Sequence, residues 1–390
     1  MEKQIMLHTL VQPDQEARVL IVSLRNLKSH VSRASVYELE DTIGKCDFVD
    51  VIEPECHSDF FKASNQLSND AVRAVGGGRF FKSLPGKTYT LKKDYEIIFF
   101  FCQSIKDILV LNSVKDWRKR CKTAICWMDE IWERDIDAWQ NNLSLLNQFD
   151  HVFMNFELSL KKLRSLINVP CWPIPYGVDA LKFSPMSHPQ VLNRSVDLMS
   201  VGRRSVITHD ALLNLAKKRD LFYVYDTIKD LYMTNHSHHR NSYMNFLKRS
   251  QFTFVNRAKF DLSGTSNSQE EVGPRFFEGA ASGVIMLGEK PNCDAFRQNF
   301  AWDDAVIEVP FNCPDIGDVL NHLEAQPERL AAARNNNIVN ALLHHDWAYR
   351  WEYILNTCNL QVQPLLLERK DRLAALSATV DSWISLPQAC

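Results

Sequence analysis

An acid stands in the middle of a mostly apolar segment, EEVGPRFFEGAASGVIMLGE, at residues 270–289. Gly273 followed by Pro274 predicts the start of a helix, because proline at the first helical position has no N–H to leave unpaired. Glu278 then lies one turn into the helix, on the same face as Arg275. An acid so placed can accept two vicinal hydroxyls, while Arg275 and the helix N-terminus hold a diphosphate. The alternative is an ordinary helix with a favourable acid near its start.

Two arginines follow another predicted strand, residues 196–202. The strand ends at Gly202, and Arg203 and Arg204 come next. Open α/β sheets bind ligands at the carboxyl edge, where paired guanidinium groups can neutralise phosphate. Taken alone, the pair fits a solvated turn equally well. Two further polar residues end a neighbouring strand and are expected at the same edge: Asn256 and Arg257.

The first half of the chain holds a second pair of acids, Asp129 and Glu130, just past a predicted strand. A partly buried carboxylate there could act as the general base for an acceptor hydroxyl. The alternative is an acid at a helix N-terminus, which is favourable without any catalytic role. His57 also follows a strand, and a lone histidine is more typical of a structural position.

Neither the histidines nor the cysteines predict a metal site. His236, His238 and His239 lack the i, i+4 helical spacing of zinc ligands, so we expect a polar loop before a helix. The ten cysteines include no CxxC pair, and several lie in apolar runs, where a free thiol behaves as a small hydrophobe. The pattern is typical of a reducing cytoplasm.

The composition describes a soluble globular protein without a dominant charge. Lysine and arginine number 45 and aspartate and glutamate 47, so the net charge is −2. No global field favours nucleic acid, and we expect no nucleic-acid partner. The chain lacks a signal-peptide pattern and any apolar run of about 18 residues, so we expect neither secretion nor a membrane span. The basic run at 115–127 could touch anionic lipid, although a solvated helix end before a strand explains it as well.

Short apolar strands alternate with helical stretches through the first half of the chain, as in a parallel sheet covered on both faces. This predicts a Rossmann-like α/β domain. Because GxGxxG does not follow the first strand, no dinucleotide site is expected. Three glycines at 76–78 predict a mobile loop, either over an acceptor or as a plain connection. The predicted strands are 18–24, 47–53, 95–103, 122–128, 151–156 and 169–176.

A Pro-, Ser- and Asn-rich stretch at 180–192 predicts a linker, after which the α/β pattern restarts. The second set of strands is predicted at 196–202, 221–226, 251–256, 283–288 and 305–310, and a helical tail begins near 338. We therefore expect an acceptor-binding domain at 1–185, a second Rossmann-like domain at 186–350, and helices at 351–390 that pack back towards the first domain.

Four motifs resemble GT-B glycosyltransferases of the bacterial group-1 type. IPYGVDALKFSP resembles their interdomain segment, and SVGRR their first C-domain strand and phosphate loop. EEVGPRFFEGAASGVIML resembles their donor signature, in which two acids are separated by seven residues, as Glu270 and Glu278 are. HHDWAYRWEYIL resembles their closing His/Arg helix. The resemblance covers residues 174 to 350 and implies two Rossmann-like domains facing across a cleft.

The resemblance also implies roles for individual residues. Glu278 would bind the ribose of a nucleotide sugar, and Glu270 would lie near the donor sugar. Glu271 stands beside Glu270 and could take that role, and Glu-Val-Gly-Pro replaces the family's Phe-Gly, so retention of configuration is not assumed. The residues implied for the diphosphate are Gly273 and Arg275, with Gly202 and Arg203 or Arg204.

The activity implied is transfer of a hexose from a nucleotide diphosphate sugar, expected to be uridine-based, to an acceptor hydroxyl. The resemblance implies no bound metal and no cofactor beyond the donor. The acceptor is a saccharide, a lipid or a small molecule, and the expected location is cytoplasmic, with at most peripheral contact at the inner membrane face. The alternatives are a sugar-nucleotide epimerase of the same fold and a non-catalytic nucleotide-sugar-binding protein.

Overall fold

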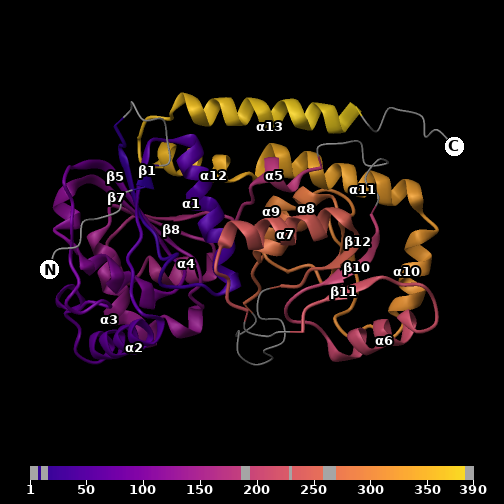
Figure 1. The fold of residues 1–390 in the computed structure, drawn as a ribbon, viewed down its shortest axis with the longest axis horizontal. Coiled ribbons are helices and arrows are strands. Elements are labelled where there is room, and N and C mark those ends of the chain that lie inside the picture. Colours follow the sequence, from indigo (N-terminus) through magenta and orange to yellow (C-terminus); the bar gives the residue numbers. More distant parts are fainter. Residues whose placement is uncertain (1–7, 10–15, 186–193, 228–230, 258–268, 383–390) are drawn as a thin grey trace. The chain divides into compact units, whose positions relative to one another are not determined.

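A computed structural model describes residues 8–9, 16–185, 194–227, 231–257 and 269–382 (Figure 1). The chain divides into two compact units. The N-terminal unit comprises Met1–Pro175 and Ile354–Leu366, and the C-terminal unit comprises Tyr176–Tyr353 and Leu367–Cys390. The sequence placed this division between residues 185 and 186.

The N-terminal unit is built on a sheet whose strand order, within the described residues, is β1-β3-β2-β5-β7-β8-β9. All of its neighbouring strands are parallel except β1, which pairs antiparallel with β3. The six strands predicted from 18 to 176 are confirmed; five have shorter bounds and β7 begins one residue earlier. They are β2 (Val19–Val22), β3 (Val49–Ile52), β5 (Tyr95–Cys102), β7 (Cys121–Met128), β8 (His151–Met154) and β9 (Cys171–Pro173), and the sequence did not predict β1 (His8–Thr9).

Helices and 3-10 turns connect these strands and share one apolar core with them. The core residues come from alternate positions of β2, β5 and β7, such as Leu20, Ile98 and Ala124. The helices are α1 (Ala34–Cys46), α2 (Ser58–Val75), α3 (Gln140–Leu143) and α4 (Glu157–Leu163), and the longest 3-10 segment is Ile105–Ser113. The expected α/β fold of this half is confirmed.

Of the three glycines after α2, Gly77 is exposed and Gly78 is buried. Gly76 and Gly77 have φ angles of 73° and 67°, a left-handed conformation that ends α2 at little cost only with glycine. A Cβ on Gly78 would lie 2.7 Å from the Leu145 side chain, so the backbone lies directly against the core. The segment fits the plain connection that the sequence left open as an alternative, and its packing partner Leu145 lies far along the sequence.

A buried ion cluster lies beside the carboxyl ends of β2, β5 and β7. Asp107, which is fully buried, pairs with Lys28 and with Arg33, whose Nη1 lies 2.9 Å from its Oδ2. Burial alone would raise the pKa of Asp107, but Arg33 and Lys28 outweigh it and lower the pKa to about 2. The pKa of Arg33 is raised overall. Burial lowers this pKa, but the negative charges of Asp107 and Asp129 outweigh burial.

Asp107→Asn is expected to lower the free energy of unfolding at pH 7 by about 3 kcal/mol, because two cations lose their buried counter-charge. The pKa of Asp107 is depressed in the folded state, so its contribution is present above the ordinary value of 3.8 and is lost as pH falls towards about 2. Urea unfolding of both proteins at pH 7 and pH 3 measures this. The difference between wild type and variant should shrink at pH 3, and an unchanged difference would contradict the ionised pair.

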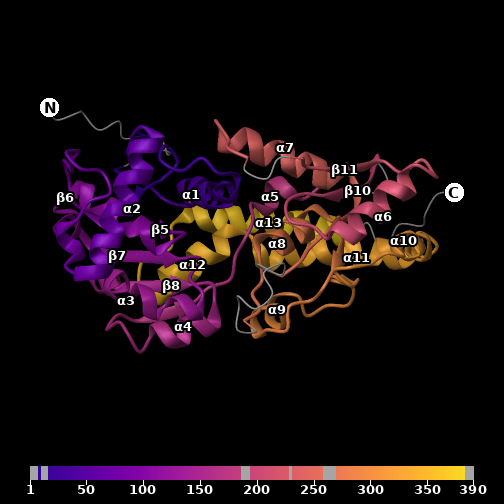
Figure 2. The same ribbon diagram turned by 90° about the horizontal axis from the view of Figure 1, so that it is seen from below.

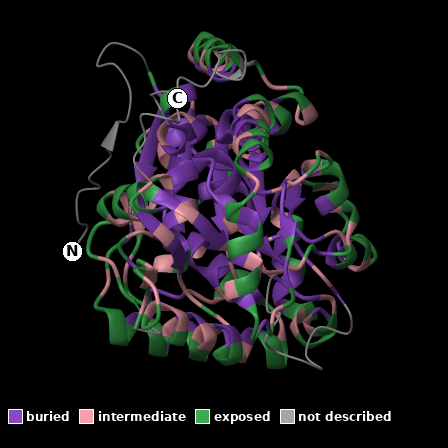
Figure 3. Cartoon of the chain, turned by 90° about the vertical axis from the view of Figure 1, so that its right-hand side faces the viewer, coloured by how far each residue is buried: buried purple, intermediate pink, exposed green. Residues whose placement is uncertain are grey.

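The C-terminal unit has an all-parallel sheet with the order β11-β10-β12-β13-β14 in the described residues. Its strands are β10 (Val196–Ser200), β11 (Tyr223–Tyr225), β12 (Ser250–Phe254), β13 (Ile285–Gly288) and β14 (Ile307–Glu308). All five were predicted. Figure 3 shows the buried strands with the exposed residues on surrounding helices and loops.

The helices of this unit fall into two groups, as expected for a sheet covered on both faces. Helix α6 packs with α10, whereas α8 packs with α7 and α11 (Figure 2). Their bounds are α5 (Ala180–Phe183), α6 (Val206–Ala216), α7 (His236–Arg249), α8 (Pro274–Ser282), α9 (Asp294–Asn299), α10 (Ile316–Glu324) and α11 (Pro327–Asn340).

The histidine-rich segment forms the first turn of α7, and the predicted polar loop is therefore wrong. Asn235 caps the helix by accepting a hydrogen bond of 3.0 Å from the His238 N–H. Asparagine is among the strongest N-cap residues. Because its side chain accepts the His238 N–H, a polar segment begins a helix here.

The tail is helical, as predicted. A π-helical segment (Ala341–His345) continues α11 and precedes α12 (Trp347–Thr357) and α13 (Pro364–Ser382). Its residues divide between the units, because Ile354–Leu366 cluster with the first and Leu367–Cys390 with the second. Among the described residues, no helix combines the length and apolar character that crossing a membrane requires.

Candidate functional site

Helix α8 has a buried face, and among the described residues no side chain caps its N-terminus. Gly273 is its N-cap, Pro274 opens it, and Gly283 ends it with φ 65°. These are the bounds that the sequence predicted. Phe277 and Ala280 are buried, so the helix is fixed against the core. In its first turn, the Phe276 N–H donates to the Gly273 carbonyl at 3.4 Å. The helix therefore offers the partial positive charge that anions bind.

Arg275 lies against Gly202, at the end of β10. Gly202 has φ 84°, and a Cβ at this position would overlap the Arg275 guanidinium. Glycine suits this left-handed conformation, and the overlap shows how closely the end of the Arg275 side chain approaches the backbone. The two segments predicted to hold phosphate, from β10 and α8, are thus brought together. We call Gly202, Gly273, Arg275 and Glu278 the α8 site.

A carboxylate already occupies part of the predicted phosphate loop. The Gly202 N–H donates to both oxygens of Asp226 at 3.0 and 2.9 Å, and Arg204 Nη1 donates to Oδ1 at 2.8 Å. The Arg204 guanidinium also lies 5.3 Å from the centre of the Tyr225 ring. Arg203 is exposed. Sequence reasoning missed Asp226, because nothing local links it to a glycine 24 positions earlier.

Glu278 is buried and ion-paired, with only 4% of its surface exposed. Arg240 of α7 donates from Nη1 to its Oε1, and the Tyr243 hydroxyl also hydrogen-bonds its carboxylate. Sequence reasoning missed both partners. Their i, i+3 spacing would have placed them on one face once α7 was recognised as a helix.

The two adjacent acids before α8 have different surroundings. Glu270 is partly exposed, pairs with Arg257 and accepts a hydrogen bond of 2.7 Å from the Asn292 N–H. Glu271 is 3% exposed, and Gln269 Nε2 donates to its Oε1 at 2.7 Å. Arg257, predicted to serve a phosphate, therefore pairs with an acid. Glu270 lies among residues that follow β12 and β13, at the carboxyl edge of the sheet.

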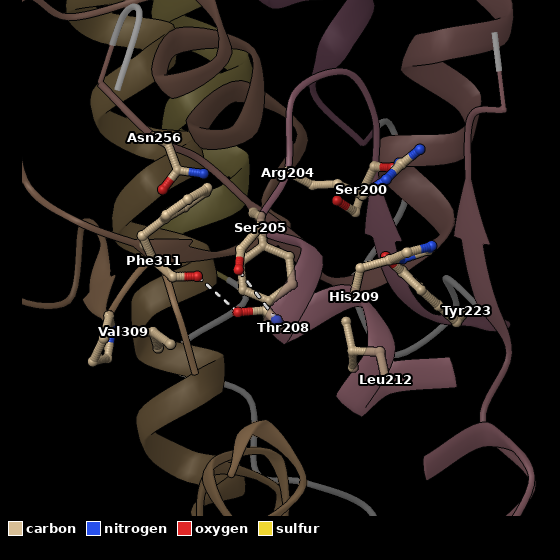
Figure 4. Close-up of a pocket in the computed structure, with 13 residues that line it drawn as sticks. Ser200, Arg204, Ser205, Thr208, His209, Leu212, Tyr223, Asn256, Val309 and Phe311 are labelled. Atoms are coloured by element: carbon tan, nitrogen blue, oxygen red, sulfur yellow. Dashed lines mark hydrogen bonds between the residues drawn. The ribbon is translucent and has the colours of Figure 1, made fainter. Parts of the chain in front are cut away.

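Asn256 lines a small pocket between the ends of β10, β12 and β14 and the start of α6 (Figure 4). Thr208 Oγ1 donates to the Phe311 carbonyl at 2.7 Å, and Ser205 caps α6 by accepting from the Thr208 N–H. The cavity is about 20 Å³, room for about one water molecule. This cavity, which Asn256 borders, is too small for a nucleobase.

A larger hollow, about 430 Å³, lies at the opposite edge of the same sheet. It is lined by charges of both signs, including Asp197, Arg334 and the ion pair of Arg219 with Glu324. It is separate from the α8 site, because Asp197 and Gln251 belong to the opening residues of β10 and β12.

The acids of the N-terminal unit follow β7. Asp129 is 3% exposed, and its N–H donates to the Cys102 carbonyl at 2.9 Å. Glu130 accepts a hydrogen bond of 3.3 Å from Trp132 Nε1. Both lie at the carboxyl edge where Arg33 and Asp107 also gather, which is the position that sequence reasoning assigned to them.

Residues 213–356 match a family model described as glycosyl transferase-like. Comparison with curated protein sequences found no match. The matched range contains α7, α8 and the α8-site residues Gly273, Arg275 and Glu278, whereas β10 and Gly202 precede it.

Several solved structures share the fold. An alpha-glucosyltransferase in complex with UDP-glucose and DNA containing an abasic site has 11% identity and a TM-score of 0.51, over 88% of this chain and 99% of that one. An alpha,alpha-trehalose-phosphate synthase (UDP-forming) from Burkholderia vietnamiensis has 9% identity and a TM-score of 0.50, over 88% and 100%. An alpha-glucosyltransferase in complex with UDP has 10% identity and a TM-score of 0.51, over the same shares.

The fold is that of the GT-B glycosyltransferases, with two Rossmann-like units, as the motifs predicted. Residues 213–356 are in addition similar to a family described as glycosyl transferase-like.

The expectation that nucleic acid is excluded was wrong. Alpha-glucosyltransferases with this fold have been solved in complex with DNA. A net charge of −2 is a sum over the whole chain and says nothing about a local binding surface. The charge balance therefore does not separate classes of acceptor.

Proposed function

We propose that this enzyme transfers a hexosyl group from a UDP-sugar to an acceptor hydroxyl, with protein cations in place of a bound metal. The observation that carries the proposal is the contact of Arg275 with Gly202 at the uncapped start of α8, one turn before Glu278. A cation and a helix N-terminus suit a diphosphate, and a carboxylate suits a ribose diol. The UDP complexes of proteins with this fold support the choice of nucleotide.

In the reaction, the bond from the sugar C1 to the β-phosphate oxygen breaks, and a bond from C1 to the acceptor oxygen forms. Negative charge develops on the departing diphosphate, where Arg275 and the α8 N-terminus stabilise it without reorganising. The acceptor hydroxyl loses its proton to a base, a role that we assign to Asp129 or Glu130. The carboxylate near the transferred sugar is Glu270 or Glu271, and Glu270 is the more exposed.

Binding of the diphosphate requires a rearrangement around Asp226. The carboxylate accepts the Gly202 N–H and Arg204, which are donors that a phosphate would use. We propose that the donor's phosphate either displaces this carboxylate or binds on the Arg275 side and leaves it in place. Asp226→Asn separates the two by the size of its effect, because UDP binding should strengthen more when the lost carboxylate is one that phosphate must displace than when it stays in place.

Arg275→Ala is expected to weaken UDP binding by about tenfold to a hundredfold, because a hydrogen bond between charged groups contributes about 1.5–3 kcal/mol. Uridine should bind wild type and variant within about twofold of each other. Isothermal titration calorimetry with UDP, UMP and uridine measures this. Arg297→Ala is the matched control, because Arg297 is an exposed arginine of α9 that pairs with Asp294. Equal losses for UDP and uridine would contradict a phosphate role.

Turnover gives an independent test of the reaction class. UDP should be released from a UDP-sugar at an acceptor-dependent rate, and a chelator such as EDTA should leave that rate unchanged. Loss of activity in EDTA, restored by a divalent cation, would overturn the metal-independent proposal. Acceptor-independent interconversion of the sugar would instead support an epimerase.

A further inference from the structure

Helix α7 delivers two side chains to the buried acid of the α8 site. Arg240 and Tyr243 lie on one face of the helix, three residues apart. Arg240 donates to Glu278 Oε1. The side chains of Arg240 and Glu278 are only 7% and 6% exposed. An ion pair so removed from water requires good geometry, because desolvation of each charge is costly.

Other contacts fix the two α7 side chains. The Arg240 guanidinium lies 4.7 Å from the centre of the Phe183 ring and 5.9 Å from that of Tyr243. Burial and then the negative charge of Glu278 raise the pKa of Tyr243, so its hydroxyl stays protonated and donates to the carboxylate. Arg275 also acts electrostatically on Tyr243 and opposes part of this rise in its pKa.

The hydrogen-bonding capacity of Glu278 leaves room for a ligand. An ionised carboxylate accepts about four hydrogen bonds. Among the described residues Arg240 and Tyr243 supply one each, and two further positions match the two donors of a ribose diol. Without these partners the carboxylate would be free to change rotamer.

We propose that Arg240 and Tyr243 are positioning residues that hold Glu278 in one orientation for the 2′- and 3′-hydroxyls of the donor ribose. This inference rests on the proposed function, since it names what prepares the ribose-binding acid of the same site. The competing explanation is that the contacts only join α7 to α8. The two explanations differ in whether the 2′-hydroxyl is recognised through α7.

Calorimetric affinities for UDP and 2′-deoxy-UDP test the inference. Wild type is expected to prefer UDP by about tenfold or more, the effect of one hydrogen bond to a charged group. Arg240→Met should bring this ratio close to one, mainly by weakening UDP binding, and Arg240→Lys should give an intermediate ratio. Tyr243→Phe should lower the ratio by about threefold to tenfold while keeping the buried ion pair.

Arg249→Met is the matched control, because Arg249 is an exposed arginine at the end of the same helix and should keep the wild-type ratio. Each variant is first checked by thermal unfolding. If Arg240→Met does not fold, Tyr243→Phe decides.

The outcomes separate the inference from the function on which it rests. If wild type does not bind UDP, the proposed donor is wrong. If wild type prefers UDP over 2′-deoxy-UDP and the folded variants keep that ratio, the positioning role is overturned and α7 only supports the fold. A parallel loss of affinity for both nucleotides would overturn it too.

Discussion

Replacing Glu278 by alanine is expected to lower the free energy of unfolding by about 3–5 kcal/mol, because Arg240 is left buried without its counter-charge. The same change should weaken UDP binding by about tenfold to a hundredfold, through loss of hydrogen bonds from the ribose hydroxyls to a charged acceptor. Urea unfolding measures the first effect and calorimetry with UDP the second. Unchanged UDP affinity in a folded variant would contradict the ribose assignment.

The double variant Arg240→Met with Glu278→Met distinguishes the two effects. Replacing both members of a buried ion pair by apolar residues of similar volume is often close to neutral. The double variant should therefore recover most of the stability lost on Glu278→Ala while still binding UDP weakly. A double variant as unstable as the single one would show that the instability does not arise from the unpaired Arg240.

The second large effect is expected at Arg369 of α13, which joins two buried acids. Its Nη2 lies 2.6 Å from Asp179 Oδ1 and 2.7 Å from Asp346 Oδ2, and the three side chains are 6%, 1% and 0% exposed. Asp346 also accepts the Ala180 and Ala348 N–H groups at 2.8 and 2.9 Å. The arginine thus neutralises two carboxylates that would otherwise repel each other in a dry environment.

Arg369→Met should destabilise the C-terminal unit by about 3–5 kcal/mol, more than any exposed ion pair contributes. The neighbouring variant Lys370→Met is the control. Lys370 pairs with Glu352 at 2.6 Å, but these side chains are 30% and 22% exposed, so its loss should cost less than about 1 kcal/mol. Hydrogen exchange should show faster exchange in α13 for Arg369→Met. Equal stability of the two variants would contradict the importance of burial.

The start and end of α8 could be predicted because they depend on neighbouring residues alone. Pro274 fixes the first turn and Gly283 adopts the left-handed conformation that ends it. The parallel strands could be predicted because each is a continuous run of apolar residues. The His-rich start of α7 was missed for the opposite reason, because its composition resembles a loop and a single cap, Asn235, decides the conformation.

By itself, the sequence determined the α/β class, the strands and the spacing that places Arg275 and Glu278 on one helix face, because periodicity and local dihedral preferences act over a few residues. Only the tertiary structure decided that Glu278 meets Arg240 and that Gly202 meets both Asp226 and Arg275. These contacts join residues far apart in the chain, and their energies depend on burial. A carboxylate in the sequence is therefore an acid of known type, but the fold decides which charge it faces.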